Sequence, residues 1–272
     1  MTALVLFTDL DGTLLHSETY RYEAALPVLA DLKAEGVPVI PVTSKTRAEV
    51  ESLFQAIGFA DPFVVENGSA VYIPRDGCPF DLPEGEDDGP YRVLQLGVSY
   101  VMARAGLKAI AQDIGRPLKG FGDLSVEQIQ HLTGLAEADA KQAKMREFTE
   151  PFLTPKNVEP EALMAAAEEM GFRVVVGDRF SHLIGAAAGK GAAVDALAAL
   201  YGTTLPEGVS VTTAGLGNSP NDIDMLSRVD WAVVVPGADG PHPQLRDRGW
   251  RIAPAPAPEG WVAAVRQILE DI

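Results

Sequence analysis

The sequence predicts an α/β fold: a doubly wound, Rossmann-like parallel sheet as the core, with an α+β domain inserted into it. Strand-like and helix-like segments alternate with short connections over residues 3–74, as they do where right-handed crossovers build a parallel sheet. The same alternation returns at about residue 188, and the intervening segment has a different order of elements. We therefore expect residues 1–76 and 188–272 to form the core and residues 77–187 to form the insert.

Four strands and two helices are expected in the first part of the core. The strands are runs of apolar residues, typical of strands buried on both faces, and a glycine follows each helix. The strands are expected at residues 3–7, 37–42, 63–65 and 70–73, and the helices at residues 26–32 and 50–57.

The insert is expected to begin with a linker over residues 75–90, which are rich in proline, glycine and acidic residues. Its strands are then expected at residues 91–98, 148–153, 172–176 and 180–184, the last two as a hairpin around Gly177-Asp178, and its helices at residues 100–114, 125–132, 137–145 and 160–170. The core then resumes with helices at residues 190–200, 223–226 and 260–272 and strands at residues 209–213 and 231–235.

Charge and composition exclude several classes of partner. The chain has 272 residues and a net charge of −16, from 22 basic and 38 acidic residues, which argues against nucleic acid and anionic membranes. A single cysteine, Cys78, rules out an intrachain disulfide, and neither a leader peptide nor an apolar run of ~20 residues is found. We expect a cytoplasmic protein with a small-molecule substrate, whose oligomeric state the sequence does not predict.

Asp9 and Asp11 are the first candidate site residues, because they follow the opening strand directly and precede Gly12. Open α/β sheets bind ligands beyond the carboxyl ends of their strands, so both carboxylates are expected to converge there. Two acids in one small pocket repel each other unless a cation relieves them, and Mg²⁺ accepts sparse carboxylate ligation together with substrate phosphate. The alternative is that both acids are ordinary turn and cap residues.

Four further candidates lie near the ends of other predicted strands: Thr43, Lys190, Asn218 and Asp222. In a doubly wound sheet, all of them would meet Asp9 at one edge. Other interpretations stay open, because threonine and serine commonly cap helices and a lysine on a helix is commonly solvated.

In order and spacing, these motifs resemble those of the haloacid dehalogenase-like phosphatase superfamily, whose sugar-phosphatase branch carries a large cap after the third core strand. Five segments are similar to those of the mannosyl-3-phosphoglycerate phosphatases in particular: Thr8-Asp9-Leu10-Asp11-Gly12-Thr13-Leu14-Leu15, Val42-Thr43-Ser44-Lys45-Thr46, Val65-Glu66-Asn67-Gly68, Arg146-Glu147-Phe148-Thr149-Glu150-Pro151 and Gly177-Asp178-Arg179-Phe180-Ser181-His182. The resemblance implies hydrolysis of 2-O-mannosyl-3-phosphoglycerate to phosphate and mannosylglycerate, a compatible solute.

The resemblance also implies a role for each candidate. Asp9 would be the nucleophile that forms an aspartyl-phosphate, and Asp11 would be the general acid and base. Thr43 would bind a phosphoryl oxygen, and Lys190 would balance the negative charge. Mg²⁺ would be held by Asp9, Asp11, Asn218 and Asp222. The predicted substrate-binding residues are Gly12, Ser44, Lys45, Asn67, Arg146, Arg179, His182 and Asn221.

Asn218 departs from the family pattern, in which the last motif usually reads Gly-Asp-x-x-Asn-Asp. An amide oxygen can bind Mg²⁺ without contributing charge, so we expect weaker metal affinity with function retained. The alternatives are a phosphatase for another sugar phosphate, such as glucosyl-3-phosphoglycerate or sucrose phosphate, a phosphomutase, or a weakly active homologue that binds sugar phosphates.

Overall fold

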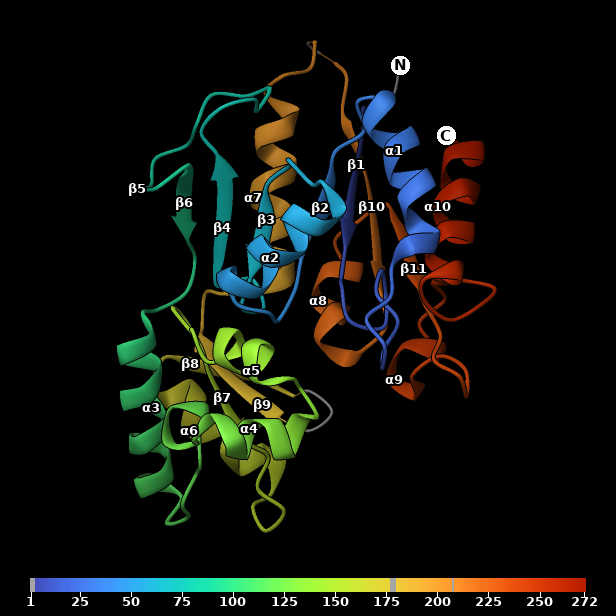
Figure 1. Cartoon of the computed structure of the whole chain (residues 1–272). Helices are drawn as coiled ribbons and strands as arrows, with labels where there is room; N and C mark the ends of the chain where they lie inside the picture. The colour runs from blue at the N-terminus through green and yellow to red at the C-terminus, as the bar shows by residue number, and fades with distance from the viewer. Residues whose placement is uncertain (1–2, 177–179, 207) are drawn as a thin grey trace.

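The computed structural model describes residues 3–176, 180–206 and 208–272. Its centre is a parallel sheet of five strands in the order β12-β11-β10-β1-β2 (Figure 1), which confirms the predicted core. These strands are β1 (Ala3–Thr8), β2 (Val39–Pro41), β10 (Val211–Gly217), β11 (Trp231–Val234) and β12 (Arg251–Ile252). A parallel bridge between Val42 and Val64 connects the end of β2 to β3 (Phe63–Val65).

A second sheet, of four antiparallel strands in the order β3-β4-β6-β5, corrects part of the predicted insert. It contains β4 (Ala70–Pro74), β5 (Glu86–Asp88) and β6 (Tyr91–Gln95). The expected linker therefore contains a strand, and the strand expected to open the insert pairs with the core instead. β5 was not predicted because its residues are acidic. It is an edge strand, and its Asp87 forms an ion pair with Arg92 of β6 at 2.7 Å. The division into core and insert stays a prediction. The pairing of β6 with β4 places the first boundary nearer to residue 97 than to residue 77.

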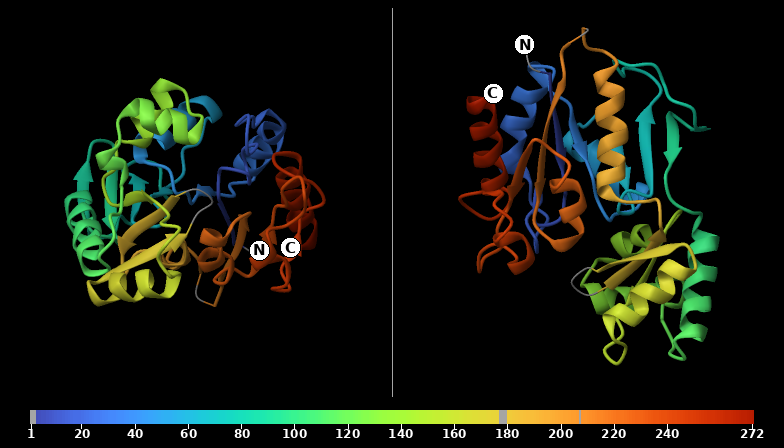
Figure 2. Two further views of the ribbon diagram at one scale, coloured as in Figure 1. Left: turned by 90° about the horizontal axis from the view of Figure 1, so that it is seen from below. Right: turned by 180° about the vertical axis from the view of Figure 1, so that it is seen from behind.

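The remaining insert forms a separate layer at the carboxyl ends of the core strands (Figures 1 and 2). We call this layer, residues 97–187, the cap. Its antiparallel sheet has the order β7-β9-β8. Its elements are β7 (Glu150–Leu153), β8 (Phe172–Val176), β9 (Phe180–Gly185), η2 (Phe121–Asp123), α3 (Tyr100–Asp113), α4 (Val126–Thr133), α5 (Glu137–Ala143) and α6 (Pro160–Glu169). The hairpin turn predicted at Gly177 and Asp178 lies outside the described residues.

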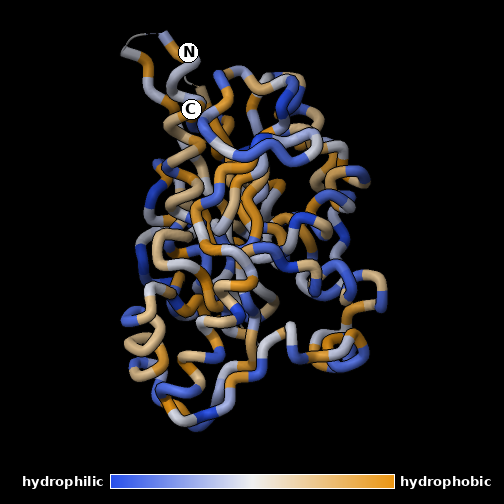
Figure 3. Tube along the Cα trace, turned by 90° about the vertical axis from the view of Figure 1, so that its left-hand side faces the viewer, coloured by the Kyte–Doolittle hydropathy of each residue, from blue (hydrophilic) through white to orange (hydrophobic). Residues whose placement is uncertain are grey.

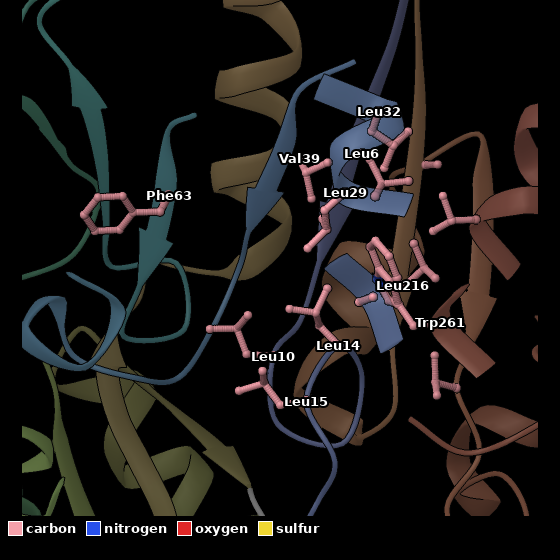
Figure 4. Packing of buried hydrophobic residues seen from close by; sticks show 14 of the residues in the cluster. Leu6, Leu10, Leu14, Leu15, Leu29, Leu32, Val39, Phe63, Leu216 and Trp261 are labelled. Carbon is pink, nitrogen blue, oxygen red and sulfur yellow. The ribbon is translucent and has the colours of Figure 1, made fainter. Parts of the chain in front are cut away.

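Helices cover both faces of the central sheet. Successive residues of β1 point to opposite faces, so each face has apolar side chains that a helix can bury. Leu4 and Leu6 pack with α1 (Leu26–Ala34), α2 (Arg47–Ile57) and α10 (Glu259–Asp271). Figure 4 shows Leu6, Leu216 and Trp261 gathered in this layer. Val5 and Phe7 pack on the other face with α7 (Lys190–Gly202) and α8 (Ile223–Leu226). Figure 3 shows many of the hydrophobic segments gathered in the middle of the molecule and many of the hydrophilic ones towards its outside.

Helix α2 begins after Thr46, whose side chain and that of Glu49 form a reciprocal capping box. Thr43 and Ser44 are therefore not its caps, and the alternative interpretation of these two residues is wrong. Besides β5, five short elements were not predicted: η1 (Glu23–Ala25), η2, η3 (Pro220–Asp222), α9 (Pro243–Arg246) and β12. Within the described parts of the chain, we find no helix with the length and apolar character needed to span a membrane.

Candidate active site

The carboxyl ends of β1, β2 and β10 place the predicted site residues at one edge of the sheet. Thr8 lies opposite both Pro41 and Leu216, so the segments that follow these three residues leave the sheet side by side. Asp9 is held at the tip of β1 by a hydrogen bond from its N–H to the carbonyl of Leu216, at 2.9 Å. The nearly complete burial of Asp9, 5% exposed, makes its charge depend on a few neighbours.

Lys190 is the cation closest to Asp9. Its ammonium group lies 2.6 Å from Oδ1 of Asp9 and 2.6 Å from Oδ1 of Asp222, and all three residues are buried. Lys190 begins α7, far along the chain from Asp9, and Asp222 ends η3 after β10. The structure thus brings together a lysine and two aspartates from three distant segments, with one positive charge between two negative ones.

Burial, together with this imbalance of charge, explains the shifted pKa values. Burial and the carboxylate of Asp222 raise the pKa of Asp9 from its ordinary 3.8 to about 7, against the opposing effect of Lys190. Burial lowers the pKa of Lys190, but the attraction of Asp222 and Asp9 outweighs it, so the net shift is upward. Lys190 therefore stays charged, and Asp9 binds its proton more tightly than an ordinary aspartate does.

We expect the metal-free protein to lose stability relative to an Asp9→Asn variant as the pH rises through neutrality. The folded state holds the proton of Asp9 more tightly than the unfolded chain does. The stability that this proton gives is fully present below pH 3.8 and is lost as the pH passes about 7. Urea unfolding of both proteins in chelator, between about pH 4.5 and about pH 8, measures the difference. Parallel pH dependences of the two unfolding free energies would contradict this assignment.

Asp11 lies beside Asp9 but has a different partner. Its Oδ2 lies 2.8 Å from the ammonium group of Lys45, which also lies 3.6 Å from Glu49. The turn between the two acids and Thr13 depends on Gly12, which has a φ of +76° and no room for a Cβ against the side chain of Asn218. Gly12 therefore allows Asn218 to approach the two acids closely.

A cavity of about 390 Å³, which we call the catalytic cavity, opens over these acids. It is lined by Asp9, Asp11, Ser17, Tyr20, Ser44, Thr133, Val175, Phe180, His182, Asn218, Ser219 and Asn221. A smaller cavity of about 190 Å³, which we call the cap pocket, adjoins it and is lined by Asp11, Tyr20, Ser44, Lys45, Glu49, Phe121, Thr133, Leu135, Ala143, Arg146, Pro151, Phe180 and His182. Core and cap residues line both cavities together.

The donors around the catalytic cavity fit a hard divalent cation such as Mg²⁺. Among the described residues, Oδ2 of Asp9 accepts only the hydroxyl of Thr13, at 3.3 Å, and the buried Oδ1 of Asp11 has no hydrogen-bond partner. The side chain of Asn218 lines the same cavity, and its amide oxygen would complete a sparse oxygen set of the kind that Mg²⁺ accepts. This set contains only two carboxylates. Over the described ranges, no three or more His, Cys, Asp and Glu side chains are grouped so that they could hold a metal ion by themselves.

Asp222, which was predicted as a metal ligand, has both carboxylate oxygens engaged by the protein, and its binding of a metal stays a prediction. Its Oδ1 faces Lys190, and its Oδ2 accepts the N–H groups of Asn218 and Ser219 at 2.9 and 3.0 Å. Both oxygens are engaged because the carboxylate caps the turn that follows β10. The structure therefore gives Asp222 the role of holding Lys190 and the Asn218 loop in place.

Four other predicted residues lie around the two acids. Thr43 is buried, and in the described part of the chain its hydroxyl is engaged only as acceptor from the N–H of Lys45, at 3.2 Å, which leaves its proton free to donate. Ser44 lines both cavities. Asn221 lines the catalytic cavity and donates to the side-chain carbonyl of Asn67 at 3.1 Å, so Asn67 lies behind Asn221.

The cap residues predicted to bind substrate differ in their surroundings. Arg146 is largely committed to protein contacts, because it donates to the carbonyl groups of Ser44 at 2.7 Å and Ala143 at 3.1 Å, although it also lines the cap pocket. His182 lines both cavities, and burial, with smaller effects of Arg146 and Lys190, lowers its pKa to about 3, so its imidazole is neutral. Arg179 lies outside the described residues.

The sequence analysis missed Tyr20, Thr133 and Phe180, which line both cavities. Tyr20 has a φ of +55°, which is rare for a bulky residue, and its ring lies 5.2 Å from the ammonium group of Lys45. A tyrosine shortly after the Asp9–Thr13 motif was a usable signal. Phe180 stands in one of the five segments that carry the resemblance, whereas no local pattern marks Thr133, which the folding of the cap brings to the site.

Comparisons with known proteins agree with this geometry. Residues 6–79 match the model of a haloacid dehalogenase-like hydrolase family. A relative named glucosyl-3-phosphoglycerate/mannosyl-3-phosphoglycerate phosphatase, from Persephonella marina, is 38% identical, over 99% of this chain and 98% of its own length. A mannosyl-3-phosphoglycerate phosphatase from Pyrococcus furiosus is 36% identical, over 85% of this chain and 90% of its own.

A solved structure supports the same architecture. A phosphatase of the haloalkanoate superfamily from Bacteroides thetaiotaomicron aligns over 100% of this chain and 96% of its own, with a TM-score of 0.71. At 16% identity, this likeness concerns the fold alone. It confirms the combination of a parallel core with an added antiparallel unit.

Proposed function

Because the chain belongs to the haloacid dehalogenase-like hydrolases and is a phosphoric monoester hydrolase, we propose that it releases phosphate from 2-O-mannosyl-3-phosphoglycerate. One observation supports this most: Asp9, which contacts the ammonium group of Lys190 at 2.6 Å, lines a cavity that adjoins a pocket under the cap. The first cavity suits a phosphate, and the adjoining one suits the organic part of the substrate. Glucosyl-3-phosphoglycerate is a second candidate, because the name of the Persephonella marina relative includes both substrates.

The proposed reaction has two steps, each a displacement at phosphorus. First, the carboxylate of Asp9 attacks the phosphorus atom, the bond to the glycerate oxygen breaks, and Asp11 gives that oxygen a proton. Asp11 then takes a proton from water, whose oxygen attacks the phosphorus atom and releases Asp9 and inorganic phosphate. The charge of Lys190 offsets part of the negative charge that gathers around Asp9 in both steps.

Other residues of the site position the reacting groups. Thr43, whose hydroxyl accepts the N–H of Lys45 and keeps its own proton free, would donate that proton to a phosphoryl oxygen. Asp9, Asp11 and Asn218 would hold Mg²⁺, which would neutralise the phosphate oxygens when bound. Asp222 keeps the ammonium group of Lys190 directed at Asp9. This arrangement fits phosphoryl transfer, in which positioning and charge neutralisation supply most of the catalysis.

The cap pocket suits an anionic, hydroxylated leaving group. Its cations are Lys45, which pairs with Asp11 and Glu49 of the same lining, and Arg146. His182, with Nδ1 buried and unpartnered among the described residues, provides a neutral polar group. A carboxylate of glycerate pairs favourably with such cations, and sugar hydroxyls with the neutral imidazole. We therefore assign the glycosylglycerate part of the substrate to this pocket.

A panel of phosphate esters tests the proposal. Phosphate release is measured with Mg²⁺ for mannosyl-3-phosphoglycerate, glucosyl-3-phosphoglycerate, sucrose phosphate and simple sugar phosphates. We expect the two glycosyl phosphoglycerates to have the highest kcat/KM. A preference for sucrose phosphate or a simple hexose phosphate would refute the substrate assignment, and retention of phosphate on an isomerised sugar would indicate a mutase.

Replacing Asn218 with aspartate is expected to tighten Mg²⁺ binding by about tenfold, because a third carboxylate adds negative charge beside Asp9 and Asp11. Calorimetric titration of Mg²⁺ into both proteins measures the affinity directly, and the Mg²⁺ dependence of phosphate release gives a second readout. Asn221→Asp is the matched control, since Asn221 lies on the same loop but donates to Asn67. Equal affinities of wild type and Asn218→Asp would exclude Asn218 as a ligand.

A further inference from the structure

Glu66, in the loop after β3, makes an extended contact between the core and the cap. Its side chain is fully buried, at 0% exposed. Oε1 accepts the N–H of Glu147 at 2.8 Å, and Oε2 accepts the N–H groups of Phe148 and Thr149 at 3.3 and 2.8 Å. The hydroxyl of Thr149 also donates to Oε2, at 2.7 Å. One core carboxylate thus binds three successive backbone amides of the cap.

The backbone of the loop is shaped to present this carboxylate. Glu66 and Asn67 have φ values of +50° and +59°, in the left-handed region that costs energy for residues other than glycine. Gly68 follows at +84°, and a Cβ there would collide with the carbonyl group of Gly189. Two consecutive strained residues persist only where the surrounding contacts hold them, and the cap amides supply such contacts for Glu66.

The same loop touches the segments that carry the catalytic groups. The N–H of Glu66 donates to the carbonyl of Lys45 at 3.0 Å, and the N–H of Asn67 donates to that of Thr43 at 2.9 Å. The side chain of Asn67 accepts from Asn221, and Gly68 lies against Gly189, the residue before Lys190. These contacts, none of which involves the carboxylate of Glu66, hold the loop on the core, so that the carboxylate is presented to the cap from a fixed position.

The cap residues whose backbone amides bind Glu66 are close in sequence to residues that line the cap pocket. Arg146 and Pro151, on either side of residues 147–149, both line that pocket. Pro151 pairs across the cap sheet with His182, which lines the pocket too. The position of residues 147–149 therefore sets where these side chains stand relative to Asp9.

We propose that Glu66 is a positioning residue that fixes the register of the cap over the phosphate site, and that recognition of the organic part of the substrate depends on it. The proposal builds on the phosphatase function proposed above. Glu66 does not contact the reacting atoms. Its effect is therefore confined to substrates that use the cap pocket and is small for a phosphate ester that does not need the cap.

Glu66→Gln tests this proposal with the smallest change, because glutamine keeps the size of the side chain. It replaces one acceptor oxygen by an NH₂ group, which would face a backbone N–H of residues 147–149 and could not accept a hydrogen bond from it. Glu150→Gln is the matched control. Glu150 is also buried, at 1% exposed, and accepts a backbone N–H, that of Gly122 at 2.9 Å, but its described hydrogen-bond and ion-pair partners, Gly122 and Arg104, both belong to the cap. Circular dichroism at the assay temperature establishes that each variant is folded.

We expect Glu66→Gln to lower kcat/KM for mannosyl-3-phosphoglycerate by about 10- to 100-fold and for p-nitrophenyl phosphate by less than about threefold. Hydrogen exchange at the amides of residues 147–149 is expected to accelerate. Glu150→Gln should leave the ratio of the two kcat/KM values unchanged. Equal losses on both substrates, or unchanged exchange at residues 147–149, would overturn the proposal. If the wild type hydrolyses no glycosyl phosphoglycerate, the proposed substrate fails and the exchange measurement alone decides the role of Glu66.

Discussion

Replacing Asp9 with asparagine is expected to reduce phosphate release by about 10⁴-fold or more while the protein stays folded. An amide oxygen is a far weaker nucleophile than a carboxylate, so the first displacement at phosphorus loses its attacking group. The fold tolerates the change because Lys190 keeps Asp222 as its partner at 2.6 Å. Steady-state phosphate release from mannosyl-3-phosphoglycerate and from p-nitrophenyl phosphate measures the loss, which is expected for both substrates.

Asp195→Asn is the control for this variant. Asp195 lies on α7, like Lys190, but its side chain is 53% exposed and pairs with Arg228 on the surface. The substitution removes the same charge from the chain without touching the site, so turnover is expected to stay within about twofold of wild type. Normal turnover by Asp9→Asn would remove the nucleophile from the proposed mechanism.

Replacing Lys190 with methionine is expected to lower the free energy of unfolding by about 3–5 kcal/mol at neutral pH and to abolish phosphate release. The ammonium group is 1% exposed and lies between two buried carboxylates, so its removal leaves Asp9 and Asp222 facing each other without a cation. Urea unfolding measures the stability, and a phosphate assay measures the activity. Lys141→Met, at a lysine 60% exposed on the cap surface, is the control.

A double variant separates the two roles of Lys190. Adding Asp222→Asn to Lys190→Met removes one of the two unpaired charges, so part of the lost stability is expected to return. Activity is not expected to return, because Asp9 still lacks its cation. A double variant no more stable than Lys190→Met would show that the charge imbalance is not the source of the instability.

Local patterns predicted most of the parallel core. The apolar run before Asp9 becomes β1, and the helices after the first two strands form close to where their periodicity placed them. Such elements are predictable because burial and capping depend on residues close in sequence. The antiparallel pairing of β6 with β4 was missed because it depends on partners about 20 residues apart, across an acidic segment without a strand pattern.

Some residues of the site could be placed from the sequence and others could not, for a similar reason. Asp9, Lys190 and Asn218 each follow or begin a core element, and the order of strands brings such positions to one edge. The sequence did not predict that the carboxylate of Asp222 accepts hydrogen bonds from Lys190 and two backbone amides, because these contacts form only in the folded chain. Arg146 and Tyr20 show the same limit, since their surroundings are created by the docking of the cap.

The reaction of Asp11→Asn with p-nitrophenyl phosphate tests the nucleophilic role of Asp9 most directly. Nitrophenolate leaves without a proton, so Asp9 is expected to be phosphorylated, whereas the amide at position 11 cannot activate water to release it. We predict a rapid release of one equivalent of nitrophenolate, with a phosphoryl adduct that borohydride reduction and peptide mass spectrometry locate at residue 9. Nitrophenolate release without such a burst, or an adduct on another residue, would contradict the account.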